Sequence, residues 1–137
     1  MIDTEGALKS LGVLVLANSE RTFHLTGSRY FGTSRSNSDY DFFVQYDKGI
    51  EQYLSGLGFE QEWANSYDDP IAHSCWSCGN IHVQVVTDAK LKKRVQDWLK
   101  TRPALMVGTK EQLRGVWTTA ICAFVDLVPI GEYNEHP

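Results

Sequence analysis

The chain lacks any apolar run of about 18 residues, and no basic segment is followed by an apolar one. These absences argue against a membrane span and a secretion signal, so we expect a cytoplasmic protein. There is no excess of basic residues: the net charge is −4, which argues against holding nucleic acid through a broad basic surface. Repeats, low-complexity tracts and linkers are also absent. We therefore predict one domain over 1–137, with a core over about 4–101 and a C-terminal helix over about 109–127.

Cysteine is scarce. Of three cysteines, Cys75 and Cys78 form a CxxC motif that His73 and His82 flank. Such a group could hold zinc, but the second CxxC or HxxxH that usually completes a zinc site is absent. The segment predicts a hairpin, and strand alternation would send the two cysteines to opposite faces. Reduced cysteines in a cytosolic core are the simpler interpretation, and Cys122 is expected to pack within a helix.

The residues that suggest chemistry concentrate in the run 26–44, TGSRYFGTSRSNSDYDFFV. Ten residues separate the Gly27-Ser28 dipeptide from Asp39, and Asp41 follows at the start of an apolar strand. Side chains two apart on a strand share a face, so the two carboxylates would project together. They repel each other unless a cation lies between them. Magnesium, which prefers oxygen ligands, is the expected ion.

The glycine and serine of this run predict the phosphate half of the same site. Gly27 has no Cβ, so its backbone can turn sharply and approach a ligand closely. The amides after it and the Ser28 hydroxyl can donate to phosphate oxygens, and Arg29 adds a planar fork of donors. The polar connection that follows ends at Ser38, which we also assign to nucleotide binding. The structural alternative is a serine-rich turn in which both aspartates are merely turn residues.

The segment GSRYFGTSRSNSDYDFFV resembles the signature of the DNA polymerase beta-like nucleotidyltransferase superfamily, a GS dipeptide followed by DxD on the second core strand. Its spacing is most similar to that of the minimal nucleotidyltransferases, single small domains that include the antitoxins partnered with HEPN toxins. The direct match covers about 20–46, and later elements fit the fold to about residue 100. The resemblance implies magnesium at Asp39 and Asp41, with the β- and γ-phosphates at Gly27 and Ser28.

The family usually has a third acid on a later strand, and here the sequence departs from that pattern. The expected strand 81–87 carries Gln84 at the corresponding position. An amide can offer a carbonyl oxygen to a metal, but it brings no charge and cannot accept a proton. His82 lies two residues earlier on the same face and could act as the base. Three other acids could take this place: Asp68, Asp69 and Asp88.

Apolar periodicity predicts an α+β fold with a mixed, largely antiparallel sheet of about five strands and helices packed mainly on one face. The expected elements are a helix over 4–18, strands over 21–26 and 40–46, a helix capped by Asp47 and ended by Gly58, a strand over 59–63, a hairpin of strands over 71–77 and 80–87, and helices over 88–101 and 109–127.

Two expectations concern the last helices. The basic cluster near the start of helix 88–101 predicts a solvated face, with a positive patch beside the active cleft as the alternative; its members are Lys90, Lys92, Lys93 and Arg94. Thr109 and Gln112 predict a capping box. The apolar stripe of the final helix should lie mostly in the core, with some of it left for a dimer interface.

These observations favour a magnesium-dependent nucleotidyltransferase that moves a nucleoside monophosphate from a triphosphate to a hydroxyl of a protein or RNA. Gln84 favours the alternative, a module of the same fold that binds nucleotide or a partner protein without turnover. A structural zinc hairpin is a third interpretation. Since nothing after residue 101 resembles a base-recognition domain, a partner or second copy is expected to complete the site.

Overall fold

The computed structural model describes residues 20–64 and 69–127, which divide into two compact units. The first unit takes 20–64 and 71–89, and the second takes 69–70 and 90–127. The helix expected over 4–18 lies outside the described residues, and that the two units fold as one domain stays a prediction. Within the described ranges, no helix combines the length and apolar character that a membrane span needs.

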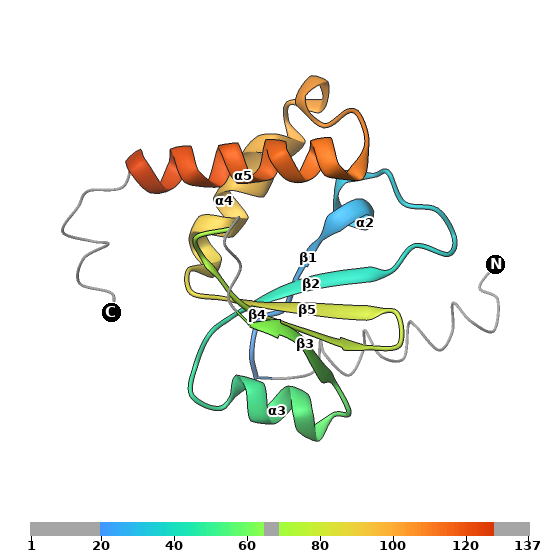
Figure 1. The fold of residues 1–137 in the computed structure, drawn as a ribbon, viewed down its shortest axis with the longest axis vertical. Helices are drawn as coiled ribbons and strands as arrows, with labels where there is room; N and C mark the ends of the chain where they lie inside the picture. Colours follow the sequence, from blue (N-terminus) through green and yellow to red (C-terminus); the bar gives the residue numbers. More distant parts are fainter. Residues whose placement is uncertain (1–19, 65–68, 128–137) are drawn as a thin grey trace. The chain divides into compact units, whose positions relative to one another are not determined.

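The first unit is built on a mixed sheet of five strands in the order β1-β2-β5-β4-β3 (Figure 1). The strands are β1 His24–Thr26, β2 Tyr40–Gln45, β3 Glu60–Ala64, β4 Ala72–Cys78 and β5 Ile81–Val86. Strands β2 and β5 run parallel, and the other three neighbouring pairs are antiparallel. The predicted α+β fold and largely antiparallel sheet are confirmed, although β1 is shorter than the strand expected over 21–26.

One face of this sheet carries the apolar core. Phe42 of β2 pairs in register with Val83 of β5, and both are buried. Helix α3, Ile50–Gly56, covers the same face and contributes the fully buried Ile50 and Leu54 (Figure 1). Each such side chain stabilises the fold by roughly 1.5–3 kcal/mol through its removal from water. Alternation along the strands therefore directs Asp41, His82 and Gln84 to the opposite face, which we call the polar face. The ends of β2 and β5 on this face also carry the buried Phe43 and Val86, which pack with Ala89.

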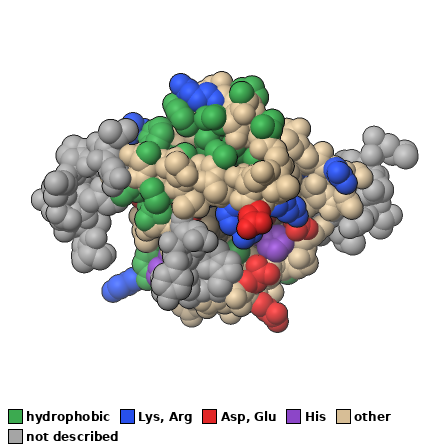
Figure 2. Space-filling model, turned by 45° about the horizontal axis from the view of Figure 1, so that its top comes forward, with side chains coloured by type: hydrophobic (Ala, Val, Ile, Leu, Met, Phe, Trp, Pro, Cys, Tyr) green, Lys and Arg blue, Asp and Glu red, His purple; other side chains and the backbone are tan. Residues whose placement is uncertain are grey.

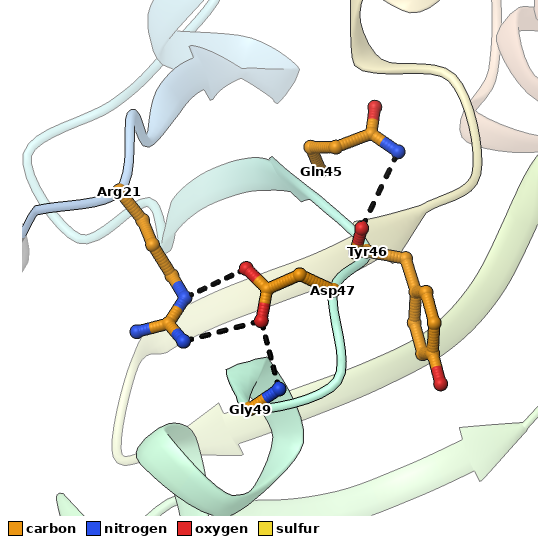
Figure 3. A network of polar contacts seen from close by, with 5 residues as sticks. All are labelled: Arg21, Gln45, Tyr46, Asp47 and Gly49. Atoms are coloured by element: carbon orange, nitrogen blue, oxygen red, sulfur yellow. Dashed lines mark hydrogen bonds and ion pairs between the residues drawn. The ribbon is translucent and has the colours of Figure 1, made fainter.

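Gln45, the last residue of β2, ties the sheet to the segment after β5. Its Nε2 donates to the Thr87 carbonyl oxygen at 3.0 Å, and its Oε1 accepts from the Ala89 amide at 2.8 Å. Ala89 opens helix α4, Ala89–Lys100, and the first amides of a helix have no acceptor within it. Figure 3 shows the same side chain beside the Tyr46 carbonyl oxygen. Gln45 thus supplies a cap from a distant strand.

Asp47 stabilises the turn before α3, but it is not the N-cap that the sequence predicted. Arg21 donates to both of its carboxylate oxygens, through Nε at 2.9 Å and Nη2 at 3.1 Å, and the Gly49 amide donates to Oδ1 at 2.8 Å (Figure 3). The N-cap position of α3 is Gly49. The hydrogen bond from Arg21 holds the pKa of Asp47 below its usual value. The backbone amides of Gly49 and of Ile50, the first residue of α3, also help to lower this pKa.

The second unit is helical: it contains all of α4 except Ala89, the 3-10 turn η1 over Pro103–Leu105, and helix α5 over Lys110–Leu127. The predicted capping box is present: the Thr109 amide donates to Gln112 Oε1 at 2.8 Å, and the Gln112 amide donates to Thr109 Oγ1 at 3.2 Å. Both helices that the sequence predicted here are confirmed.

Lys90 and Arg94 of the basic cluster are exposed, as predicted, but three other side-chain expectations for this unit are wrong. Lys92 is not solvated: it is buried, and its ammonium nitrogen lies 4.1 Å from the centroid of the Trp117 ring, where a cation–π attraction holds it. Most of the α5 stripe is only partly buried, with Ala120 and Ile121 as its buried members among the side chains that the structure describes. Cys122 is exposed instead of packed.

Candidate functional site

The face of the sheet opposite α3 carries the predicted site residues. Asp41 of β2 pairs in register with His82 of β5 on one side and with Thr26 of β1 on the other. Their neighbours along each strand belong to the buried core, so these three side chains project from the polar face. Along β5, Ile81, Val83 and Val85 are buried, while His82 and Gln84, which the sequence placed on one face, are partly exposed. Val86 ends the same face but is buried.

Gly27 meets the Asp41 carboxylate where β1 ends. It opens the short helix α2, Gly27–Phe31, and its φ of +71° lies in the left-handed region (Figure 1). A Cβ at this position would overlap the carboxylate oxygen Oδ2 of Asp41. Both the backbone conformation and the missing space therefore require glycine. The structure thus brings the GS dipeptide against the second aspartate of the DxD motif.

His82 lies between two carboxylates. Its Nε2 is 3.3 Å from Oδ2 of Asp39, which precedes β2, and its Nδ1 is 3.4 Å from Oε2 of Glu62 in β3. Figure 2 shows acidic side chains and a histidine exposed side by side on one face of the molecule. Each imidazole nitrogen can donate when it carries a proton and accept or bind a metal when it does not. The neighbourhood of the two aspartates therefore includes a group that can exchange protons.

Arg29 and Ser38, both predicted to bind nucleotide, contact each other. Arg29 Nη2 donates to the Ser38 carbonyl oxygen at 2.8 Å, and the guanidinium carbon lies 3.9 Å from the centroid of the Tyr40 ring. The Ser38 hydroxyl accepts from the Arg35 amide at 2.7 Å. These contacts hold the loop between the GS dipeptide and the aspartates. Arg29 Nε is buried without a hydrogen-bond partner among the described residues, so one donor of the guanidinium is unused.

Gln84 lies on the polar face, as predicted, but it is not the β5 residue beside the aspartates. In register it pairs with Phe43 of β2 and with Cys75 of β4. The position directly beside Asp41 belongs to His82. Because residues opposite each other on neighbouring strands are in closest contact, His82 is the better placed of the two to act with the carboxylates.

Of the other acids considered, Asp69 is buried in the helical unit and accepts a hydrogen bond from Trp117 Nε1 at 2.9 Å. Asp68 lies outside the described residues. Asp88 directly precedes α4 and is half-buried. The carboxylate that does reach the site is a different one, Glu62.

Glu62 is the site residue that the sequence did not reveal. In the pairing of β3 with β4, Gln61 lies opposite Trp76 and Trp63 lies opposite Cys75, so Glu62 is an extra residue at a bulge. A bulge locally redirects the side chain of the extra residue. Alternation in the sequence predicts only that Glu62 lies on the opposite face from Gln61 and Trp63. The strand order of the sheet is what brings Glu62 close to His82.

The four zinc ligands considered from sequence do not come together as a group. His73 Nε2 lies 3.7 Å from Oε1 of Glu51 in α3, and its ring centroid is 4.4 Å from that of Tyr46. Cys75 and Cys78 are three residues apart in a regular stretch of β4, so they lie on opposite faces of the sheet, as predicted. Cys78 is exposed at the end of the strand. The grouping of His73 and Cys78 with Cys75 and His82 is therefore wrong.

Cys75 is instead a neighbour of Glu62, with Sγ 3.7 Å from Oε2. Burial, followed by the negative charge of Glu62, raises the pKa of Cys75 to about 12. Both causes disfavour the thiolate, so without a bound cation Cys75 is a protonated thiol at neutral pH.

A comparison of the chain with models of known protein families found no match, and a comparison with curated protein sequences found none. Membership of the nucleotidyltransferase superfamily therefore stays a prediction. It rests on the GS and DxD motifs, of which Gly27, directly after β1, lies against the carboxylate of Asp41 in β2.

The raised pKa of Cys75 predicts a protected thiol. Three pKa units separate about 12 from the ordinary 9.0, so the thiolate fraction at pH 8 falls about a thousandfold. In the folded protein, iodoacetamide should label the exposed Cys78 long before Cys75, as followed by peptide mass spectrometry. Glu62→Gln should speed the labelling of Cys75, because it removes a charge that opposes the thiolate. Equal labelling rates for Cys75 and Cys78 would contradict this assignment.

Proposed function

We propose that this protein is a magnesium-dependent nucleotidyltransferase, which transfers a nucleoside monophosphate from a nucleoside triphosphate to a hydroxyl acceptor. The observation that carries the proposal is the approach of Gly27 to the Asp41 carboxylate, with Asp39 and His82 alongside. A turn without a Cβ lets phosphate oxygens come close to backbone amides. Adjacent carboxylates supply the oxygen ligands that a hard cation on those phosphates requires.

The residues of this face fit magnesium and a triphosphate. Asp39 and Asp41 would hold the ion through carboxylate oxygens, and the backbone at Gly27 and Ser28 would donate to the β- and γ-phosphates. When bound, magnesium supplies positive charge that offsets the charge developing on the phosphoryl oxygens. Arg29 would add its unused Nε donor after a small movement away from the Tyr40 ring.

His82 would act as the general base in place of the third carboxylate of the family. Nε2 accepts the proton of the acceptor hydroxyl, and the carboxylates of Asp39 and Glu62 stabilise the imidazolium that results. The hydroxyl oxygen forms a bond to the α-phosphorus, and the bond from that phosphorus to the bridging oxygen breaks. Pyrophosphate leaves with the electron pair of the broken bond. Gln84 would contribute only its carbonyl oxygen.

The acceptor in this proposal is a hydroxyl of a protein or an RNA end, presented by a partner or a second copy of the chain. Gln84 favours a second candidate function, a nucleotide-binding or partner-binding module without turnover. A neutral amide cannot help to hold a second cation at the attacking hydroxyl as a carboxylate does. The first function requires measurable transfer of a nucleoside monophosphate, and the second requires binding without transfer.

Two glycines offer a matched test of the phosphate turn. Gly27 and Gly32 both have positive φ, +71° and +80°, so alanine introduces similar backbone strain at either position. Only at Gly27 would the Cβ overlap Asp41; at Gly32 it meets nothing within 4 Å. We expect Gly27→Ala to weaken magnesium–ATP binding by at least about tenfold, or 1.4 kcal/mol, in calorimetry, while Gly32→Ala binds like the wild type. Equal affinities for both variants would reduce the GS dipeptide to an ordinary turn.

A transfer assay tests the function itself. The protein is incubated with magnesium, each α-labelled triphosphate in turn, and a cell extract that supplies acceptors. The wild type should label a macromolecule, Asp41→Asn should not, and His82→Ala should be slower by about a hundredfold or more, the usual contribution of a positioned base. Gln84→Glu should change the rate only modestly. If the wild type labels nothing and Gln84→Glu does, the protein is a binding module and the proposed function fails.

A further inference from the structure

We propose that Glu62, Cys75 and His82 form a second cation site, specific for a borderline metal such as zinc. The three residues come from the adjacent strands β3, β4 and β5. Their ligand atoms, a carboxylate oxygen, a thiol sulfur and an imidazole nitrogen, all lie within 4.8 Å of one another. The site shares no metal ligand with the proposed magnesium site, because neither the GS dipeptide nor a carboxylate of the DxD motif is a ligand here.

The distances between these atoms agree with tetrahedral coordination. Zinc lies about 2.0–2.3 Å from nitrogen, oxygen and sulfur ligands, which places neighbouring ligand atoms about 3.3–3.8 Å apart. Glu62 Oε2 is 3.4 Å from His82 Nδ1 and 3.7 Å from Cys75 Sγ. Two of the three distances between ligand atoms therefore already suit zinc. A small inward movement of Cys75 or His82 would bring the third, between Sγ of Cys75 and the His82 nitrogen, into the same range.

The chemistry of the three ligands selects the metal. Sulfur and imidazole nitrogen favour zinc, whereas magnesium prefers oxygen ligands alone. On binding, the Cys75 thiol proton passes to the buffer and the sulfur forms a bond to the metal. Three protein ligands leave the fourth position to water, the composition of an open zinc site. The bulge at Glu62 and the ladder between β4 and β5 position the ligands before any ion arrives.

Asp39 provides an independent observation in favour of the site. A histidine that binds a metal through one ring nitrogen almost always donates the other N–H to a carboxylate or carbonyl, which fixes the tautomer. Here Nδ1 faces the metal ligands, and Nε2 lies 3.3 Å from Oδ2 of Asp39. The outer carboxylate that such a site requires is thus present. One consequence rests on the proposed function: with zinc on Nδ1 and a proton on Nε2, His82 could not serve as the base.

Cobalt(II) is the probe for this site, because a cobalt–thiolate bond gives a near-ultraviolet charge-transfer band. The reduced, metal-free full chain should take up one equivalent of cobalt with this band, and zinc should remove it by displacement. Cys75→Ser should abolish the band. Cys78→Ser and Cys122→Ser are matched controls that should keep it, since both thiols are exposed and Cys75 is the one beside Glu62 and His82. A wild type without the band, or Cys75→Ser with it, overturns the proposal.

A second variant guards against loss of binding through misfolding. Glu62→Gln keeps the thiol and should keep the band, but it should weaken cobalt binding by at least about tenfold through the lost charge. Unchanged affinity in Glu62→Gln removes Glu62 from the site and also overturns the proposal. Because no nucleotide is present, failure here leaves the magnesium–triphosphate site standing, and failure of the transfer assay leaves the zinc site standing.

Discussion

The parallel pairing of β2 with β5 is the constraint on which both faces of the sheet depend. It sets Phe42 beside Val83 in the core and Asp41 beside His82 on the polar face. A shift of one residue would exchange the faces, which would bury a carboxylate and expose the apolar side chains. The hydrophobic free energy that holds the register, roughly 1.5–3 kcal/mol for each large side chain, therefore also places the histidine beside the aspartates.

His82 connects the two proposed cation sites. On one side it lies near Asp39 of the oxygen-rich site that suits magnesium, and on the other it lies near Glu62 and Cys75, which suit zinc. If both proposed sites are correct, ligand chemistry would separate a hard cation from a borderline one on the same sheet face. Zinc on Nδ1 would keep the proton on Nε2, so His82 could not act as the base. Under both proposals, zinc binding would therefore inhibit nucleotidyl transfer.

Much of this arrangement follows from local pattern. Alternation predicted that His82 and Gln84 share a face of β5, and the GS and DxD motifs predicted that Gly27 and Asp41 serve one site. In the structure, Gly27 lies against the Asp41 carboxylate. The first prediction depends on the two-residue repeat of a strand, and the second depends on the missing Cβ of glycine. Both are properties of short segments. Spacing alone also indicated the capping box at Thr109, because its partner is three residues away.

What the sequence could not predict depends on contacts between distant segments. Glu62 reaches His82 only through the strand order and a bulge, neither of which short-range periodicity encodes. Lys92 looked solvated, but its burial depends on the ring of Trp117, one helix away. Asp47 was predicted to be an N-cap, yet its carboxylate binds Arg21, 26 residues earlier, as well as the nearby Gly49 amide. The chemistry of the side chains identified candidate residues, and the tertiary contacts determined which of them lie together.

The proposed function requires that the GS turn and the two aspartates form one metal–triphosphate site. Paramagnetic broadening by manganese, a substitute for magnesium, tests it most directly in the nuclear magnetic resonance spectrum of labelled protein with a non-hydrolysable ATP analogue. The account predicts that the amide signals of Gly27, Ser28 and Asp41 broaden first, only when both manganese and nucleotide are present, and that those of α3 on the opposite face broaden least. Broadening centred away from these residues, or no effect of nucleotide, would contradict the account.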